Sequence, residues 1–364
     1  MVSSASAQLS LSAHRLRVPL ANPFTTAVRS ATELETVLVR LMDAEGRSAW
    51  GETPVSKVTG VSAEASIRGI EGPLRELLQA APSLDEALVA LQLSEQPAAI
   101  RSAVDCALHD LRAQQAGEPL ARQLGAQSLR VRTDMTLSVA EASELVPKAV
   151  ALIEQGFGCL KIKIDAQHDA VTALREVRRA VGPRPVLRAD ANQAFEVAEA
   201  IRVIRELEDS EVNLSLVEQP VVAADLPGLA EVSRAVETPV MADESIWTMS
   251  DLLELLRLRA APMVNIKLAK TGGLSQAVEM LNYARAEGLR VVIGCMLESH
   301  VGISAAATLA ALLPEDDQDL DGGLWLRESP ILGGAEYRGS QILLSDAPGL
   351  GISGVRGLTN PLGE

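Results

Sequence analysis

The chain contains the stretch Leu160-Lys161-Ile162-Lys163-Ile164, in which two lysines interrupt an otherwise apolar run. Such a run predicts a buried β-strand, and residues two apart on a strand point to the same face. The ammonium groups of Lys161 and Lys163 are therefore expected side by side on one face of a buried strand. Because burying two like charges together is costly, nearby anions or a reaction must require them there.

Short apolar runs that end in polar residues repeat from about residue 130 onward, and each is followed by a stretch with helical periodicity. The polar residues that mark these runs recur at intervals of 24 to 28 residues, from Asp190 through Glu218, Asp243 and Lys267 to Cys295. Strands and helices that alternate at this spacing favour a parallel barrel over a sandwich. An open doubly wound sheet is the alternative, but no Gly-x-Gly-x-x-Gly follows an early strand.

The two ends of the chain differ from this repeat. Residues 1–128 mix strand-like and helix-like stretches, including a helical face from Ile100 to Leu111 that Gly117 should end, and they predict a small α+β domain. Residues 129–324 are expected to form a modified TIM barrel, (β/α)7β, in an α/β fold. The segment 325–364 is rich in Gly and Pro, and we expect it to return to the first domain.

Composition limits the kinds of partner and the compartment. The chain has 48 acidic and 33 basic residues and a net charge of −15, which disfavours nucleic acid and anionic membranes as partners. Cys106, Cys159 and Cys295 have no close spacing, so they indicate reduced thiols in a cytoplasmic protein. The first dozen residues do not predict a signal peptide, and no apolar window is long enough to span a membrane.

Charged residues mark the ends of consecutive predicted strands, where the active site of a barrel lies. With residues 132–137 as strand 1, the lysine pair falls on strand 2 and Lys267 on strand 6, which face each other across an eight-stranded barrel. Asp190, Glu218 and Asp243 end the three strands between them. Converging carboxylates repel one another, and a hard cation such as Mg²⁺ relieves that repulsion through oxygen ligands. No His or Cys accompanies them, so zinc is not expected.

A metal with a lysine on each flank suits proton transfer beside a carboxylate. The cation would bind a substrate carboxylate, make the adjacent C–H more acidic and stabilise the enediolate. One lysine would remove the proton and the other would return one to the opposite face, which inverts the centre. A working base must be neutral part of the time, so we expect nearby positive charge to depress a lysine pKa.

Five short motifs, taken in order, resemble the enolase superfamily in its muconate-lactonizing-enzyme-like branch. They are Lys-Ile-Lys at 161–163, Asp-Ala-Asn at 190–192, Glu-Gln-Pro at 218–220, Asp-Glu-Ser at 243–245 and Asn-Ile-Lys at 265–267. The resemblance covers the whole chain and implies a capping α+β domain, a (β/α)7β barrel and a C-terminal return. It also implies roles for the charged residues: an acid/base pair of Lys163 and Lys267, a substrate-carboxylate contact from Lys161, and Mg²⁺ ligands Asp190, Glu218 and Asp243.

Further segments resemble the dipeptide epimerases of that branch. Asp319 and Asp321 lie at strand 8, opposite the metal, and the resemblance implies that they bind the α-ammonium of a dipeptide. Residues 23–29 resemble the mobile lid loop of L-Ala-D/L-Glu epimerases, which implies that Arg29 contacts a glutamate side chain. Lid loops are thus expected near 22–30 and 56–62. By family position, Thr136 and Cys295 are expected to line the substrate pocket.

The combined expectation is a Mg²⁺-dependent dipeptide epimerase that inverts the α-carbon of the C-terminal residue. L-Ala-D/L-Glu from peptidoglycan turnover is the leading substrate, and a homo-oligomer is a family implication. A cycloisomerase, an o-succinylbenzoate synthase or an N-acylamino acid racemase of the same branch remains an alternative, although its substrate would give Asp319 and Asp321 no ammonium partner. A non-catalytic paralogue is the other alternative, and it should have lost a metal ligand or a lysine, none of which is missing.

Overall fold

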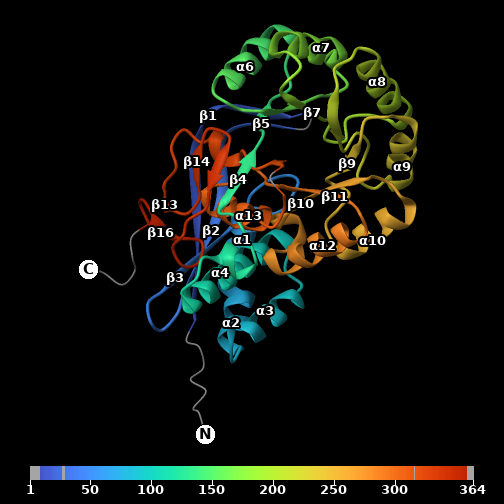
Figure 1. Cartoon of the computed structure of the whole chain (residues 1–364). Coiled ribbons are helices and arrows are strands. Elements are labelled where there is room, and N and C mark those ends of the chain that lie inside the picture. The colour runs from blue at the N-terminus through green and yellow to red at the C-terminus, as the bar shows by residue number, and fades with distance from the viewer. Residues whose placement is uncertain (1–8, 27–28, 315, 359–364) are drawn as a thin grey trace.

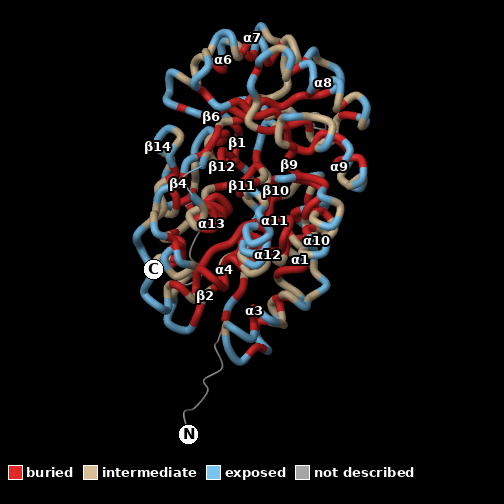
Figure 2. The backbone as a smooth tube through the Cα atoms, turned by 45° about the vertical axis from the view of Figure 1, so that its right-hand side comes forward, coloured by how far each residue is buried: buried red, intermediate tan, exposed pale blue. Residues whose placement is uncertain are grey.

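The computed structural model describes residues 9–26, 29–314 and 316–358, with only the backbone described at Thr26 and Arg29. A sheet with its helices lies at one side of a curved barrel, and the C-terminal strands lie beside both (Figure 1). Buried residues concentrate in the barrel strands and in the layer between the first sheet and its helices (Figure 2). No helix in the described ranges combines the length and apolar character that crossing a membrane requires.

The N-terminal part is an antiparallel three-stranded sheet covered by helices. Its strands are β1 (Ser10–Thr26), β2 (Arg29–Met42) and β3 (Ser48–Pro54), and its helices are α1 (Ala63–Gly69), the π-helical turn η1 (Ile70–Leu74), α2 (Arg75–Ala80), α3 (Leu84–Gln92), α4 (Ala98–Ala116) and α5 (Leu120–Gln123). Helix α4 ends where the sequence predicts, at Gly117, because a φ of 71° suits glycine. It approaches β3 so closely that a Cβ on Gly51 would lie 1.8 Å from the carbonyl oxygen of Ala103.

Strands and helices alternate through the barrel, as the repeat predicts. The strands are β4 (Arg130–Thr133), β5 (Met135–Leu137), β6 (Cys159–Lys163), β7 (Val186–Asp190), β8 (Leu214–Glu218), β9 (Val240–Ala242), β10 (Met263–Lys267), β11 (Arg290–Gly294) and β12 (Asp317–Gln318). The helices are α6 (Ala142–Glu154), α7 (Ala170–Val181), α8 (Val197–Asp209), α9 (Leu226–Ala235), α10 (Met249–Leu258), α11 (Leu268–Thr271), α12 (Leu274–Ala286) and α13 (His300–Ala310).

Strands β5 to β11 form one parallel sheet in chain order, and β12 closes it. A parallel bridge between Gly294 and Asp319 joins β12 to the end of β11, and β12 pairs in parallel with β4 on its other side. The predicted first strand is divided into β4 and β5 at Asp134, whose backbone N–H donates to the carbonyl of Gln318 at 2.9 Å. The predicted (β/α)7β architecture with an α+β cap is confirmed.

Inward-pointing residues on alternate positions fill the barrel below its carboxyl ends. Leu216, Met241, Met263 and Val292 pack together as an apolar plug inside the barrel. Leu216 and Met241 precede Glu218 and Asp243 by two residues, so the strand period places apolar side chains below and charged side chains above. These four residues therefore form an apolar layer directly below Glu218 and Asp243.

The C-terminal segment contacts both other parts of the molecule. It contains η2 (Gly322–Trp325), β13 (Ile331–Gly333), β14 (Glu336–Arg338), β15 (Gln341–Leu343) and β16 (Ile352–Val355). Strand β15 pairs antiparallel with β4 of the barrel. The backbone N–H of Leu350 donates to Asp110 on α4 at 2.8 Å. The boundaries proposed at residues 128 and 324 stay predictions, because this segment interacts with both sides.

Candidate active site

A cavity of about 100 Å³ opens at the carboxyl ends of the barrel strands. Phe24 on β1 and Val58 close it from the N-terminal part, so both predicted lid segments contribute to its wall. Phe24 packs edge-on against Trp325, with ring centroids 4.8 Å apart. Eight of the residues predicted for the site also line the cavity: Thr136, Lys161, Lys163, Asp243, Lys267, Cys295, Asp319 and Asp321.

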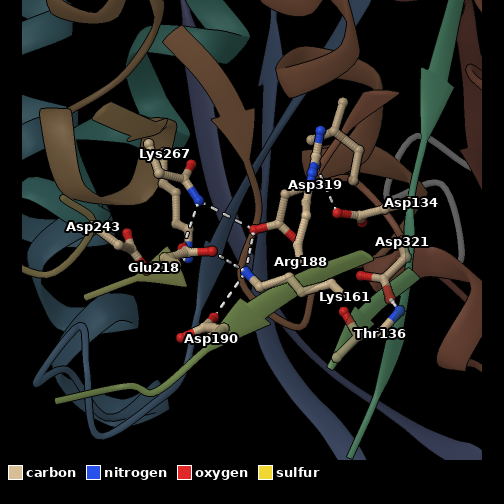
Figure 3. Close-up of polar contacts among 12 residues, drawn as sticks. Asp134, Thr136, Lys161, Arg188, Asp190, Glu218, Asp243, Lys267, Asp319 and Asp321 are labelled. Atoms are coloured by element: carbon tan, nitrogen blue, oxygen red, sulfur yellow. Dashed lines mark hydrogen bonds and ion pairs between the residues drawn. The ribbon is translucent and has the colours of Figure 1, made fainter. Parts of the chain in front are cut away.

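Strand register brings the first lysines against the first predicted metal ligands. Lys163 pairs in register with Asp190 on β7, and Asp190 pairs with Glu218 on β8. The Nζ of Lys163 lies 2.6 Å from Asp190. The Nζ of Lys161 lies 2.8 Å from Asp190 and 2.6 Å from Glu218, and it also reaches Asp319 across the barrel at 2.9 Å (Figure 3). Lys161 thus connects the predicted metal ligands to the opposite wall.

The third lysine occupies the other side of the cavity. Lys267 ends β10, and its Nζ lies 2.7 Å from Asp243, which follows β9. A fourth lysine that the sequence did not single out, Lys270, lies 2.5 Å from the other oxygen of Asp243. Lys270 also donates to the backbone carbonyl of Asp243 and to that of Asn265, the latter at 3.1 Å, so three acceptors fix its ammonium group. Its position three residues after Lys267, on the short helix α11, is the signal that could have identified it.

Burial and charge set the proton affinities of these groups. Burial, followed by repulsion from Asp190, raises the pKa of Glu218 to about 8. Burial also opposes ionisation of Asp190, but Lys161 and Lys163 hold the pKa of that carboxyl well below its usual range. The expectation of a depressed lysine pKa rests on a bound cation and on Lys161 beside Lys163, so it stays a prediction, and the pKa of Lys267 is raised in this arrangement. Burial favours that depression, but attraction from Asp243 and then Asp319 outweighs it and raises the pKa.

The two aspartates after β12 lie across the cavity from the predicted metal ligands (Figure 3). Asp321 accepts hydrogen bonds from the backbone N–H of Thr136 at 2.7 Å and from the indole N–H of Trp325 at 3.1 Å. Asn265 links the two walls, because its amide donates to Glu218 at 2.9 Å and to Asp319 at 3.1 Å. Asn265 precedes Lys267 by two residues and shares its face, which was the available signal for it.

Cys295 and Arg29, the remaining predicted residues, are not part of the network of lysines and carboxylates described above. Cys295 is buried on the cavity wall, where burial raises the pKa of its thiol, so the thiolate is disfavoured. Arg29 begins β2, but its side chain lies outside the described part of the chain. Its predicted contact with a glutamate side chain stays a prediction.

The donor set fits a hard divalent cation. Asp190, Glu218 and Asp243 supply only carboxylate oxygens. Buried oxygens of Glu244 and Asn192 lack a hydrogen-bond partner among the described residues, and Asn192 donates its backbone N–H to Asp190 at 2.9 Å. Uncompensated oxygens beside carboxylates are what a bound cation would satisfy. Each predicted ligand also contacts a lysine, so a cation would compete with Lys161, Lys163 and Lys267 for these oxygens.

A (β/α)7β barrel with an α+β cap, and with lysines and carboxylates at its strand ends, defines an enolase-type enzyme. The family described as mandelate racemase / muconate lactonizing enzyme, N-terminal domain, matches residues 10–125. The family described as enolase C-terminal domain-like matches residues 144–355. The chain belongs to the mandelate racemase/muconate lactonizing enzyme family of the enolase superfamily.

Relatives over nearly the full length define the kind of reaction. The chain is 36% identical to the L-Ala-D/L-Glu epimerase of Clostridium acetobutylicum, with 93% of this chain and 97% of that protein covered. It matches the substrate-liganded L-Ala-D/L-Glu epimerase of Bacillus subtilis with a TM-score of 0.91 and 37% identity, covering 95% and 98% of the two chains. It matches the Enterococcus faecalis dipeptide epimerase complexed with Mg and L-Leu-L-Tyr with a TM-score of 0.88 and 33% identity, covering 96% and 99%. The protein is an isomerase of the epimerase kind.

Proposed function

We propose that this protein is a Mg²⁺-dependent dipeptide epimerase that inverts the α-carbon of the C-terminal residue. The observation that carries the proposal is the placement of Lys163 and Lys267 on opposed strands of one cavity, whose wall also holds Asp319 and Asp321. Two lysines alone fit any racemase of this branch. The acidic pair faces the same cavity, with Asp321 held by the backbone N–H of Thr136, and additionally suits a substrate with a free ammonium group.

The chain's own groups divide the reaction between two faces of the substrate. Asp190, Glu218 and Asp243 would hold Mg²⁺, which supplies positive charge to the substrate carboxylate and makes the adjacent C–H more acidic. Lys163 removes the α-proton from one face and Lys267 returns a proton to the other, or the reverse for the other epimer. Lys161 faces the carboxylate end and stabilises the negative charge that develops there.

The closing residues favour exclusion of water during proton transfer. Phe24 and Val58 cover the cavity from the N-terminal part, and the edge-on contact of Phe24 with Trp325 joins the lid to the segment after β12. A closed, low-dielectric cavity strengthens the charge interactions of the lysines. L-Ala-D/L-Glu is the proposed substrate because two of the relatives above carry that activity in their names and because Arg29 begins β2 beside this lid.

The test is exchange of the substrate α-proton with solvent deuterium across a library of L,L-dipeptides in the presence of Mg²⁺. We expect exchange and epimerisation with L-Ala-L-Glu, and a loss of at least about 100-fold in Lys163→Ala, because a positioned general base contributes that much. Lys148 on α6 is exposed and is not among the described residues that line this cavity, so Lys148→Ala should retain full activity. If the unmodified protein exchanges no dipeptide in the library, the proposal is wrong. Exchange with N-acylamino acids alone would favour the racemase of the same branch.

A further inference from the structure

A second charged pair lies inside the barrel beside the proposed site. Arg188 on β7 and Asp134 between β4 and β5 are both buried, and the guanidinium Nη1 donates to the Asp134 carboxylate at 2.8 Å (Figure 3). The Nη2 of Arg188 donates to the backbone carbonyl of Asp317 at 2.5 Å. One side chain thus ties β7 to the place where β12 closes the barrel.

This pair stands directly behind the acidic wall of the cavity. One oxygen from each of Asp134, Asp319 and Asp321 lies within 4.8 Å of the other two. Among the described residues, no other three His, Cys, Asp or Glu side chains bring their ligand atoms this close together. Neither Asp134 nor Arg188 is among the described residues that line the cavity. Both residues therefore act on a bound substrate without touching it, from behind Asp319 and Asp321.

The backbone connections point to the same two aspartates. Asp134 precedes Thr136 by two residues, and the N–H of Thr136 holds Asp321. Asp317, whose carbonyl accepts from Arg188, precedes Asp319 by two residues. The pair therefore fixes the two short segments that set the positions of both carboxylates.

A purely structural role explains this pair poorly. A buried ion pair rarely stabilises a fold better than apolar side chains of similar volume, unless its remaining polar atoms are also satisfied. Here the second oxygen of Asp134 and the Nε of Arg188 have no hydrogen-bond partner among the described residues. The pair therefore has a desolvation cost that fold stability alone does not offset.

We infer that Asp134 and Arg188 are positioning residues for the ammonium end of the substrate. Arg188 anchors the β12 segment through the carbonyl of Asp317. Asp134 compensates the positive charge of Arg188, so the guanidinium does not form an ion pair with Asp319. The ammonium of Lys161 already lies 2.9 Å from Asp319. Without Asp134, the guanidinium of Arg188 would become a second positive charge that competes with the substrate ammonium for Asp319 and Asp321. This inference rests on the proposed dipeptide epimerase function and assigns specificity to two residues that do not touch the substrate.

The test compares three variants in the Mg²⁺-loaded, full-length protein with L-Ala-L-Glu as substrate. Asp134→Asn should raise KM by about tenfold with kcat changed less than about threefold, because the uncompensated arginine repels the substrate ammonium. The double variant Asp134→Asn with Arg188→Met carries neither charge, so the repulsion is absent, but the anchor of Arg188 on the Asp317 carbonyl is lost as well. Its KM should therefore lie below that of the single variant and above that of the parent. Asp110→Asn makes the same chemical change at a buried acid in α4 and should leave KM unchanged.

A second measurement separates charge from structure. The inhibition constant of N-propionyl-L-glutamate, which lacks only the ammonium of L-Ala-L-Glu, should be the same in Asp134→Asn and in the parent. Equal losses for dipeptide and analogue, or a double variant with a higher KM than the single one, would show a merely structural pair and overturn the inference. An unchanged KM in Asp134→Asn would also overturn the inference, but it would leave the proposed dipeptide epimerase function untouched. A parent that exchanges no dipeptide would remove the proposed function and this inference with it.

Discussion

At the scale of single residues, the site is a set of lysines matched to carboxylates. Lys163 contacts Asp190, Lys267 contacts Asp243, and Lys161 reaches both walls of the cavity. Their sequence positions were enough to identify all of these residues, because the strand period of two assigns each one to the barrel interior. The partners of each lysine could not be identified in that way, because they depend on the register between neighbouring strands.

Gly294 at the end of β11 leaves room for the side chains beside it. A Cβ there would lie 2.4 Å from the Oδ1 of Asn265 and 2.8 Å from the Cε of Lys267. We predict that Gly294→Ala lowers kcat by at least about tenfold, because a small displacement of a catalytic group is costly. The measurement is steady-state epimerisation at saturating Mg²⁺ and dipeptide.

The control for this prediction is Gly158→Ala. A Cβ on Gly158 would meet no heavy atom within 4 Å, so this variant should keep the kcat of the parent. A kcat for Gly294→Ala equal to that of Gly158→Ala would show that Asn265 and Lys267 adapt without cost.

At the scale of elements, carboxylates of the N-terminal part cap the helices of the barrel. Glu52 on β3 accepts hydrogen bonds from the backbone N–H groups of Ser299 and Gly302, at 2.8 Å each, at the start of α13. Asp105 on α4 accepts from the backbone N–H and the hydroxyl of Ser275 at the start of α12, at 3.1 and 2.6 Å. Because negative charge is favourable at a helix N-terminus, these contacts orient the sheet against the barrel helices that border the site.

We predict that Glu52→Gln lowers the free energy of unfolding by about 1–3 kcal/mol, because an amide NH2 group, which cannot accept, replaces one of the two oxygens that accept three buried hydrogen bonds. The third of these bonds comes from the hydroxyl of Ser299 at 2.6 Å. The measurement is urea unfolding at neutral pH. Glu64→Gln, in the first turn of α1 and exposed, is the matched control and should change stability by less than about 0.5 kcal/mol. Equal effects of the two substitutions would contradict the capping role of Glu52.

At the scale of the whole molecule, a buried carboxylate joins the N-terminal part to the C-terminal segment. Asp110 on α4 accepts from the backbone N–H groups of Trp50 at 2.9 Å and Leu350 at 2.8 Å, and from the amide of Gln114 at 3.0 Å. Burial raises its pKa to about 6, despite these hydrogen bonds. The N-terminal part and the C-terminal segment therefore meet at a carboxyl group whose pKa is raised towards neutral pH.

This raised pKa gives a pH dependence with a definite sign. The folded protein binds the Asp110 proton more tightly than the unfolded chain, so this stabilising contribution is complete below pH 3.8 and is lost as the pH rises through about 6. Asp110→Asn removes the titration. We predict that the stability of the variant relative to the parent rises across this window by up to about 3 kcal/mol. Urea unfolding of both proteins between about pH 4 and pH 7 measures the difference, and a constant difference would contradict the assignment.

Magnesium should stabilise the whole fold if it binds the proposed ligands. A ligand that binds only the folded state at 100 times its Kd adds about 2.7 kcal/mol to the free energy of unfolding. We predict a Mg²⁺-dependent rise in Tm that a chelator reverses and that Asp243→Asn greatly reduces. The reading is thermal unfolding with and without Mg²⁺, independent of activity. The same rise in parent and variant would show that the ion binds elsewhere.

The sequence by itself determined the order of the strands and the residues at their ends. Apolar runs, two-residue alternation and helix stops such as Gly117 are local signals, so a barrel with three lysines and five acids at its mouth could be predicted before any coordinates. The same locality explains why the division of the first barrel strand at Asp134 was missed. That division follows from pairing with Gln318, far away in the chain.

Only the tertiary structure decided which charges meet. The contact of Arg188 with Asp134 spans 54 positions, and that of Lys161 with Asp319 spans 158 and forms only when the segment after β12 closes the barrel. Glu52 reaches α13 across 247 positions because the N-terminal sheet packs over the barrel mouth. Side-chain periodicity determines the face of the strand to which a residue points, but closure of the barrel determines which residue it contacts.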